Sequence, residues 1–466
     1  MNPEKVVKYS VPFFVIAIIS RSIEEVSFIY YTVPVMCVFF IVLLLISSKS
    51  NVQSHHKQEN QRTDIRHPES GIKHPSSLLL RRTGLPSSII HQPYFLFLLP
   101  GLWFLLTALW SSYPEVSAAR ALYFILISIG SIAAGILWIR YSNKNIFDFL
   151  LPANLIVVLL CVFSLITNIP FDSWTAGHGK GFMGFFGHQN LLASVILFTI
   201  PTVFGFKIKD QSKKLKVLLF ILLTLNFILL ILTYSRSAIL SLIFGVIVFL
   251  ILNRNWKVLA YGFAIAAVHV IVIYSIPSLN QFTDTIIKKD FPEVYSSRMW
   301  MWEPSYKAAL EGGLFGLGYG ISHPEISSGE YSDRFEDGRL IREKGNSVLA
   351  LVEEAGVIGL ILFLLPIIYL LQKLPDLAYR QAGTRYQTLR TDRQLPDVKD
   401  ISGIRHPASP SSLHYAGAGS ILVASLAAFI LHAQFEAWWV GVGSVQLPLF
   451  FIYISLLTDF KLIRFK

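Results

Sequence analysis

Long apolar segments are the feature of this sequence that most limits its fold. A helix rises 1.5 Å per residue, so about 20 apolar residues cross the hydrocarbon core of a bilayer. Twelve stretches of roughly 18 or more mostly apolar residues occur at 6–23, 26–47, 92–111, 117–139, 146–168, 188–206, 215–233, 236–253, 257–276, 347–372, 416–434 and 441–459. These lengths predict an all-α integral membrane protein with about 12 transmembrane helices.

The amino-acid composition fits a membrane protein better than a soluble one. Apolar residues make up 53% of the chain and charged residues only 15%, whereas soluble proteins carry about 25% charged residues. The net charge of +11 does not indicate a nucleic-acid partner, because the position of the charges between apolar segments matters more than their sum. Cys37 and Cys161 lie inside apolar segments, so neither a disulfide framework nor a thiolate metal site is expected.

The distribution of basic residues predicts how the chain is oriented in the membrane. With the N-terminus in the cytoplasm, 28 of the 40 Lys and Arg residues fall on the cytoplasmic side. Eight of the other 12 lie in one long loop, 277–346, and long loops cross the membrane largely regardless of charge. The sequence therefore predicts cytoplasmic N- and C-termini and one large outer, periplasmic loop between helices 9 and 10.

Three regions follow from this pattern. They are a membrane domain of helices 1–9 at 1–276 with a cytoplasmic low-complexity loop at 48–91, a large external loop at 277–346, and a membrane domain of helices 10–12 at 347–466 with a cytoplasmic low-complexity loop at 373–415. The two cytoplasmic loops contain imperfect copies of one polar sequence, SGIKHPSSL and SGIRHPASPSSL. Their His-Pro pairs lack the spacing of a metal site, so both loops are predicted to be flexible linkers.

Five short motifs gather at the predicted outer ends of the helices and in the external loop. They are GFFGHQNLLA at 184–193, LTYSRSAIL at 232–240, SSRMWMWEPSYKAALEGGLFGLGYG at 296–320, GNSVLALVEEAGVIG at 345–359 and LHAQFEAWWVGVGS at 431–444. In this order and spacing they resemble the O-antigen ligase and O-antigen polymerase superfamily of bacterial membrane glycosyltransferases. The resemblance is clearest from about residue 180 to residue 455.

The resemblance implies a metal-independent glycosyltransferase in the cytoplasmic (inner) membrane, with its active site facing the periplasm. The donor would be a glycan on undecaprenyl diphosphate, and the acceptor lipid A-core or a similar lipid or glycan. A ligase is the preferred interpretation, because the spacing of Asn346, Gly356 and Gly359 is that of the family. A polymerase of O-antigen or exopolysaccharide repeat units, which shares the donor and differs in the acceptor, is the alternative.

Arginines are the residues that we expect to stabilise the departing diphosphate. The arginine guanidinium is permanently charged, and its planar fork matches phosphate oxygens. Arg236, in the first turn of a predicted spanning helix, is the leading candidate for a diphosphate ligand, and the alternative is an anchor at the membrane interface. Arg298 would supply a second phosphate or sugar contact, and the alternative is a salt bridge within the loop. No cofactor or metal is expected, because the outer segments lack a compact cluster of metal-ligating residues.

The chain departs from the family at the position expected to supply a base. Members with ligase activity usually have His directly before the motif Asn, and that His is taken to activate the acceptor hydroxyl, whereas this chain has Gly345. Glu343 is therefore a catalytic candidate, and Glu353, Glu354 and His323 are the neighbouring alternatives.

Further residues are expected to bind substrate: His188, Asn190, Asn346, Glu436 and Arg120. His188 and Asn190 lie at a helix start, where unpaired backbone amides favour anions. Glu436 would be costly facing lipid, so we expect it in a polar cavity, either orienting the acceptor or pairing with an Arg. Arg120 either lines the same cavity or extends to the interface.

Two other functional classes are weaker interpretations. A transporter of an anion or of a lipid-linked sugar predicts ionisable residues deep in several helices, but the deep positions here are almost all Leu, Ile, Phe and Val. A purely structural scaffold would leave the arginine-rich outer loop without a role.

Overall fold

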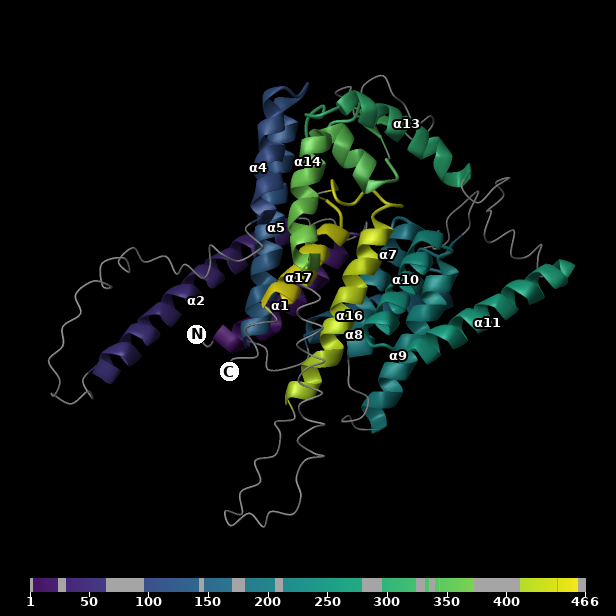
Figure 1. The fold of residues 1–466 in the computed structure, drawn as a ribbon, viewed down its shortest axis with the longest axis horizontal. Coiled ribbons are helices and arrows are strands. Elements are labelled where there is room, and N and C mark those ends of the chain that lie inside the picture. The colour runs from purple at the N-terminus through teal and green to yellow at the C-terminus, as the bar shows by residue number, and fades with distance from the viewer. Residues whose placement is uncertain are drawn as a thin grey trace, which may run out of the picture.

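The computed structural model describes residues 3–23, 31–63, 96–141, 146–169, 181–205, 213–278, 296–323, 332–334, 340–342, 344–372, 411–441 and 443–459. The chain is almost entirely helical in these ranges (Figure 1). The helices are α1 (Pro3–Ser20), α2 (Thr32–Thr63), α4 (Leu98–Leu106), η3 (Thr107–Leu109), α5 (Pro114–Tyr141), η4 (Asp148–Leu150), α6 (Leu151–Thr167), α7 (Gln189–Thr199), α8 (Pro201–Gly205), α9 (Lys213–Leu232), α10 (Arg236–Leu252), α11 (Trp256–Ser275), α13 (Ser296–Gly312), α14 (Ser347–Gln372), α16 (Ser411–His432) and α17 (Gln446–Asp459).

Each of the twelve predicted apolar segments contains a helix, which confirms the all-helical fold class. Among the residues that the structure describes, five helical segments are long and apolar enough to cross a membrane: Pro114–Tyr141, Asp148–Thr167, Lys213–Leu232, Trp256–Ser275 and Ser347–Leu370. Shorter apolar helices occupy most of the remaining segments. The helices thus indicate a membrane protein, while the count of about 12 crossings and the orientation of the termini stay predictions.

Two helix boundaries differ from the predicted segments. Helix α2 continues to Thr63, into the loop predicted at 48–91, because no Pro or Gly interrupts the polar sequence that follows the apolar segment. The segment 188–206 is divided into α7 and α8, because Pro201 lacks the N–H that a continuous helix requires.

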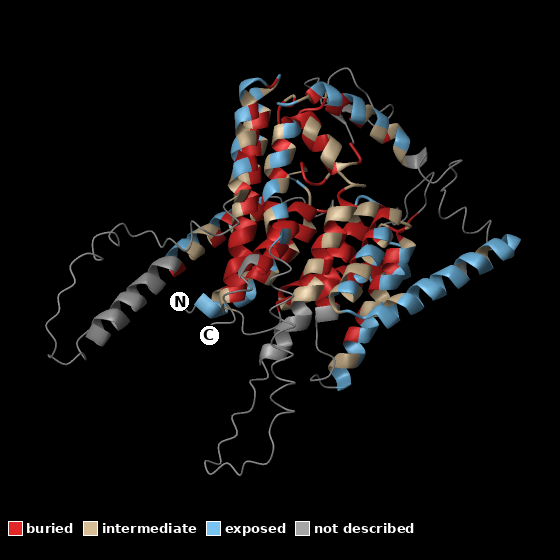
Figure 2. Ribbon diagram, in the orientation of Figure 1, coloured by how far each residue is buried: buried red, intermediate tan, exposed pale blue. Residues whose placement is uncertain are grey.

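Helix α5 forms the centre of one half of the molecule. Of its most apolar stretch 72% is buried, and small residues let its neighbours approach closely (Figure 2). A Cβ on Gly130 would lie 2.3 Å from the Cβ of Cys37 in α2, and one on Gly135 would lie 1.9 Å from the hydroxyl of Ser455 in α17. The glycines therefore set the close packing of α5 against α2 and α17.

A second half is formed by α6, α7, α9, α10 and α16. Gly245 of α10 lies against Ala424 and Ala428 of α16, which again brings two helix backbones together. The buried side chains of Asn154 and Asn226 exchange hydrogen bonds of 2.9 and 3.0 Å, and Asn154 also donates to Thr199. This polar contact joins α6, α9 and α7 inside an otherwise apolar region.

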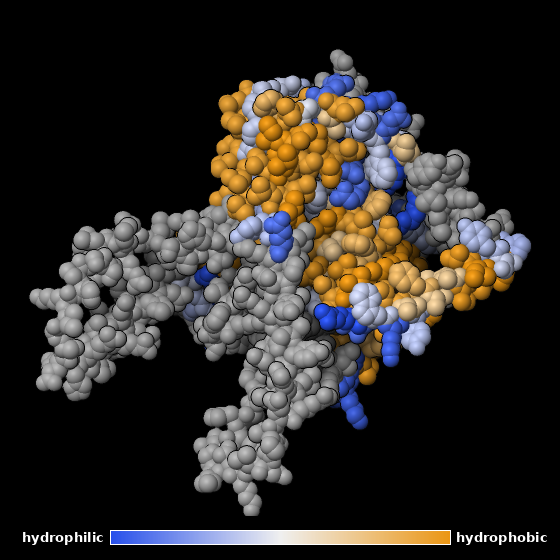
Figure 3. All heavy atoms as spheres, viewed as in Figure 1, coloured by the Kyte–Doolittle hydropathy of each residue, from blue (hydrophilic) through white to orange (hydrophobic). Residues whose placement is uncertain are grey.

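Helix α11 differs from the rest, because it extends away from the body of the molecule (Figures 1 and 2). None of its most apolar stretch is buried. Apolar side chains also cover a broad part of the surface near α4 and α14, whereas hydrophilic ones gather near α13 (Figure 3). Such an exposed apolar surface is suited to contact with lipid.

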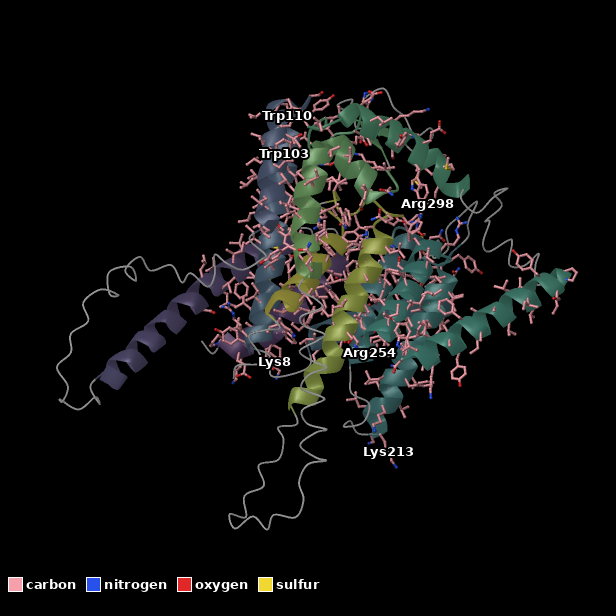
Figure 4. The ribbon with its side chains drawn as sticks, in the orientation of Figure 1. Lys8, Trp103, Trp110, Lys213, Arg254 and Arg298 are labelled. Carbon is pink, nitrogen blue, oxygen red and sulfur yellow. The ribbon has the colours of Figure 1, made fainter. Side chains whose placement is uncertain are left out.

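The predicted external loop contains helix α13 and a short antiparallel pair, β1 (Ser332–Arg334) and β2 (Leu340–Arg342). Helix α13 packs on α14 and lies at one end of the molecule, the top of Figure 1. Arg298 of α13 is near this end, whereas Lys8, Lys213 and Arg254 lie toward the opposite end (Figure 4). We call the end that carries α13 the α13 end.

Candidate functional site

Three polar side chains from distant parts of the sequence meet at the α13 end. Arg298 Nη2 donates to Glu436 Oε1 at 2.9 Å, and Asn190 Nδ2 donates to the same oxygen at 3.0 Å. The side chains of Arg298 and Glu436 remain 18% and 19% exposed, so solvent reaches both. We call Asn190, Arg298 and Glu436 the outer cluster. The structure thus brings together three of the residues that the sequence analysis selected.

Local structure fixes each member of the outer cluster. Asn190 lies in the first turn of α7, where His188 is the N-cap and its Nδ1 accepts from the Asn190 backbone N–H at 3.1 Å. Arg298 lies in the first turn of α13. Glu436 lies in the turn after α16, where its carbonyl accepts a hydrogen bond of 2.6 Å from the Ser347 hydroxyl. His188 therefore has a structural role as a cap, in addition to the substrate contact predicted for it.

Arg236 is the first residue of α10 and is half-buried. The positive charge of Arg298 acts on it, so the two guanidinium groups are electrostatic neighbours. The residue before its N-cap, Tyr234, has a left-handed φ of 50°, and the buried hydroxyls of Ser235 and Ser237 flank it. Glu436 pairs with Arg298, and Arg236 adds a positive charge within electrostatic reach of Arg298, which suits an anion.

Asn346 has a structural role at the start of α14. Its Oδ1 accepts from the backbone N–H groups of Val348 and Leu349, and its Nδ2 donates 2.8 Å to the carbonyl of Gln434. The side chain thus caps α14 and joins it to the turn that carries Glu436. Sequence reasoning placed Asn346 near substrate, whereas its side-chain hydrogen bonds are to the backbone of the chain itself.

Gly345 has a φ of 61°, which is left-handed. Its carbonyl accepts a hydrogen bond of 3.1 Å from the indole of Trp302, and a Cβ on it would lie 3.2 to 3.3 Å from the side chain of Met301. A larger residue here would be strained by the backbone and crowded by α13. The local conformation therefore favours Gly over His at position 345.

A second set of charged side chains is buried around the start of α14. Lys344 Nζ donates to Glu354 Oε1 and lies 3.5 Å from Glu353 Oε2. The remaining carboxylate oxygens accept backbone N–H bonds, from Gly320 at 2.7 Å and from His323 at 2.9 Å. We call Lys344, Glu353 and Glu354 the buried cluster, since their side chains are at most 5% exposed.

The turn at 316–320 positions this buried cluster. Gly316, Gly318 and Gly320 all have left-handed φ values, and a Cβ on Gly316 would lie 2.5 Å from the carbonyl oxygen of Glu354. Only glycine permits the turn to lie so close to α14. Arg120 Nη1 donates 3.0 Å to the carbonyl of Gly320, so Arg120 faces this turn rather than lipid.

Tyr319 fixes the same turn from its other side. Its ring stacks on Phe104 at 4.2 Å, and its hydroxyl donates 3.4 Å to the carbonyl of Val440. Burial raises the pKa of Tyr319 well above its ordinary value of 10, so the hydroxyl keeps its proton and remains a donor. The turn therefore joins α4, α14 and the link between α16 and α17.

Three candidate bases from the sequence bind other residues of the chain. Glu353 and Glu354 belong to the buried cluster, and His323 Nε2 pairs with Glu311 Oε2. Glu343 lies outside the described residues, so its role stays a prediction.

Sequence reasoning did not select two buried residues that adjoin the outer cluster. His432 Nε2 lies 3.3 Å from the Ser194 hydroxyl, which in turn donates to the carbonyl of Asn190. The charges of Glu436 and Arg298 both act on His432, which places it near them. His432 is the last residue of α16 and Glu436 follows in the turn, so no helix-face pattern indicated that they lie close together. Lys344 was counted only among the eight basic residues of the external loop, and its burial has no local sequence signal.

Within the described ranges, no group of three or more His, Cys, Asp or Glu side chains is arranged to hold a metal ion. The independence from metal expected above stays a prediction.

Comparison with known proteins adds one finding. Residues 218–364 match the family model described as O-antigen ligase. This segment includes Arg236 and Arg298 and extends through the buried cluster to the first half of α14. No curated protein matches the chain.

Proposed function

We propose that the chain, which belongs to the O-antigen ligase superfamily, is a membrane glycosyltransferase that moves a glycan from undecaprenyl diphosphate to an acceptor at the outer face of the cytoplasmic membrane. The donor would be bound with its diphosphate beside Arg236 and Arg298. The acceptor would be lipid A-core or a similar lipid or glycan.

The observation that carries this proposal is the ion pair of Arg298 with Glu436 at the α13 end, with Arg236 within electrostatic reach of Arg298. Transfer of the sugar releases a lipid diphosphate, whose negative charge grows as the bond to the sugar breaks. Fixed guanidinium groups in a partly desolvated site stabilise that charge more than water does. Glu436 holds Arg298 in place, while Arg236 adds the second positive charge.

The sidedness of the charges supports an active site on the outer face. In this proposal the α13 end faces the periplasm, and the end that carries Lys8, Lys213 and Arg254 faces the cytoplasm (Figure 4). A cysteine placed in the 48–91 or 373–415 loop would then be closed to an impermeant thiol reagent in intact cells from which the outer membrane barrier has been removed.

A polymerase of repeat units is the second candidate, and Gly345 favours it. Family members with ligase activity usually have His at this position, and here the left-handed backbone and the contact with Met301 disfavour any side chain. A polymerase would use a second lipid-linked glycan in place of lipid A-core.

Product analysis with purified protein in detergent tests both candidates. The protein is given an undecaprenyl-diphosphate glycan together with lipid A-core, or the same donor alone. A ligase yields glycosylated lipid A-core, whereas a polymerase yields a donor with a doubled and then longer glycan. If neither product forms, and proteoliposomes that contain the protein instead move the intact donor lipid across the membrane, the protein is a transporter and the proposed enzyme function is wrong.

A further inference from the structure

The family's usual base position is Gly345 in this chain, so an acceptor hydroxyl needs another proton acceptor. The base must be an unprotonated group that touches the acceptor, which requires an atom open to the site. The described candidates from the sequence do not meet this requirement. Glu353 and Glu354 are buried with all four carboxylate oxygens engaged, and His323 Nε2 pairs with Glu311. His432, which the sequence did not indicate, is fully buried beside Ser194.

Glu436 differs from these residues in how its two oxygens are used. Oε1 accepts from both Arg298 and Asn190, at 2.9 and 3.0 Å. Among the described residues, Oε2 has no hydrogen-bond partner, and the side chain is 19% exposed. One oxygen is therefore anchored by Arg298 and Asn190, and the other is accessible to solvent.

The backbone around Glu436 is also held firmly. Its carbonyl accepts from the Ser347 hydroxyl at 2.6 Å and from the Trp438 backbone N–H at 3.0 Å. Contacts from α7, α13 and α14 thus fix both the carboxylate and the chain that carries it. Such placement is what a group that receives a proton at a defined position requires.

We propose that Glu436 is the general base of this chain and accepts the proton of the acceptor hydroxyl on Oε2. This rests on the function proposed above. The acceptor oxygen forms a bond to the anomeric carbon while the bond from that carbon to the diphosphate oxygen breaks. The electron pair of the broken bond leaves with the lipid diphosphate, and the hydroxyl proton passes to Glu436.

The division of roles within the outer cluster follows from the contacts. Arg298 binds Glu436 directly and lies within electrostatic reach of Arg236, so it can contact the leaving diphosphate while it orients Glu436. Asn190 is a positioning residue, since its side-chain amide donates to Oε1. A single anchored carboxylate thus faces the nucleophile, with positive charge on the side of the leaving group.

Glu436→Gln separates the base from a merely structural role. Glutamine keeps a carbonyl oxygen for Arg298 and Asn190 and places an NH₂ group where Oε2 was, so the anchor persists while the proton acceptor is lost. We expect kcat to fall by about 100- to 10,000-fold, with binding of an undecaprenyl-diphosphate glycan changed by less than about threefold. Glu436→Asp, which keeps the carboxylate, should recover part of the rate.

Glu303→Gln is the matched control, because Glu303 lies on α13 in an exposed pair with Lys307. Its transfer rate should equal that of the wild type. A Glu436→Gln variant with a near-normal kcat would overturn the proposal for the base and leave the enzyme intact. Loss of donor binding together with kcat would make Glu436 a purely structural partner of Arg298. A wild-type protein without transferase activity would instead refute the proposed function itself.

Discussion

The outer cluster and the buried cluster contain the same kinds of groups and use them differently. In the buried cluster one lysine and two carboxylates satisfy one another and two backbone amides, and water hardly reaches them. In the outer cluster one carboxylate holds an arginine and an asparagine through a single oxygen and leaves the other oxygen open. Both clusters join α13, α14 and neighbouring segments near the same end of the molecule.

This difference separates charges that maintain the structure from charges available to a substrate. A buried ion pair is weak evidence for net stability, but removing one partner leaves an uncompensated charge, which is costly. A partly exposed cluster with excess positive charge contributes less to stability and can accept an anion. Substitutions in the buried cluster should therefore lower stability more than activity per folded protein. Substitutions in the outer cluster should lower activity more than stability.

The largest effect is expected in the buried cluster. Lys344→Met leaves two buried carboxylates without their cation, which should destabilise the fold by about 3–5 kcal/mol. The measurement is thermal unfolding of the detergent-solubilised protein, followed by size-exclusion chromatography. Lys307→Met, which breaks an exposed pair on α13, is the control and should shift stability by less than about 0.5 kcal/mol. If both variants had the same melting temperature, the buried cluster would contribute no more to stability than an exposed ion pair, and the proposed difference between the clusters would be wrong.

Substitution of Arg236 should lower activity much more than stability. Arg236→Ala removes a contact with the diphosphate worth about 2–5 kcal/mol, or about 30-fold to several thousand-fold in rate, with little change in melting. Arg236→Lys should recover only part, since lysine keeps the charge and loses the planar fork. Transfer is normalised to folded protein, and Arg254→Ala at the opposite end is the control. Full activity of Arg236→Lys would reduce Arg236 to an interface anchor.

Asn190 should produce a smaller effect. Asn190→Ala removes one neutral donor from Glu436 Oε1 and leaves Arg298 in place, at a cost of about 1–2 kcal/mol, or about 5- to 30-fold in rate. The control is Asn253→Ala, since the Asn253 side chain donates to the carbonyl of Phe249, within one turn of its own helix. A loss as large as that of Arg236→Ala would show that Asn190 itself touches substrate.

Metal removal should have the smallest effect. If the arginines supply the positive charge at the leaving group, transfer measured in an excess of chelator should stay within about twofold of the untreated rate, because charged guanidinium groups need no ion. Abolished transfer that magnesium or manganese restores would mean that the outer cluster is incomplete as described.

Apolar periodicity and length predicted the helices well, because each long apolar segment must be helical to satisfy its backbone in lipid. The sequence also selected Asn190 for its place at a helix start, Arg298 for its guanidinium and Glu436 as a carboxylate that would be costly facing lipid. It offered an Arg as one possible partner of Glu436, but it did not identify Arg298 and Asn190, which lie 138 and 246 residues away. Such pairing depends on which helices pack against each other, and no short sequence pattern contains that information.

The buried cluster shows the opposite limit of sequence reasoning. In the sequence, Glu353 and Glu354 are candidate bases and Lys344 is one of eight basic residues of the external loop, and nothing local indicates that all three are buried. Their burial is determined by the glycine turn at 316–320, whose left-handed residues bring the chain against α14. The turn was recognised as a motif, but its contact partner was not.

The break in α14 at Gly356 bears on how the protein is assembled. Gly356 has a φ of 72°, and the amides of Val357 and Ile358 donate to the carbonyls of Gly313 and Leu314 in the preceding loop. A ribosome synthesises those two carbonyls before α14, so they emerge ahead of the helix that will use them. Two backbone bonds of α14 therefore form only when the helix lies against this loop. The loop thus supplies part of the hydrogen bonding of the helix, and α14 is complete only once the two segments have packed together.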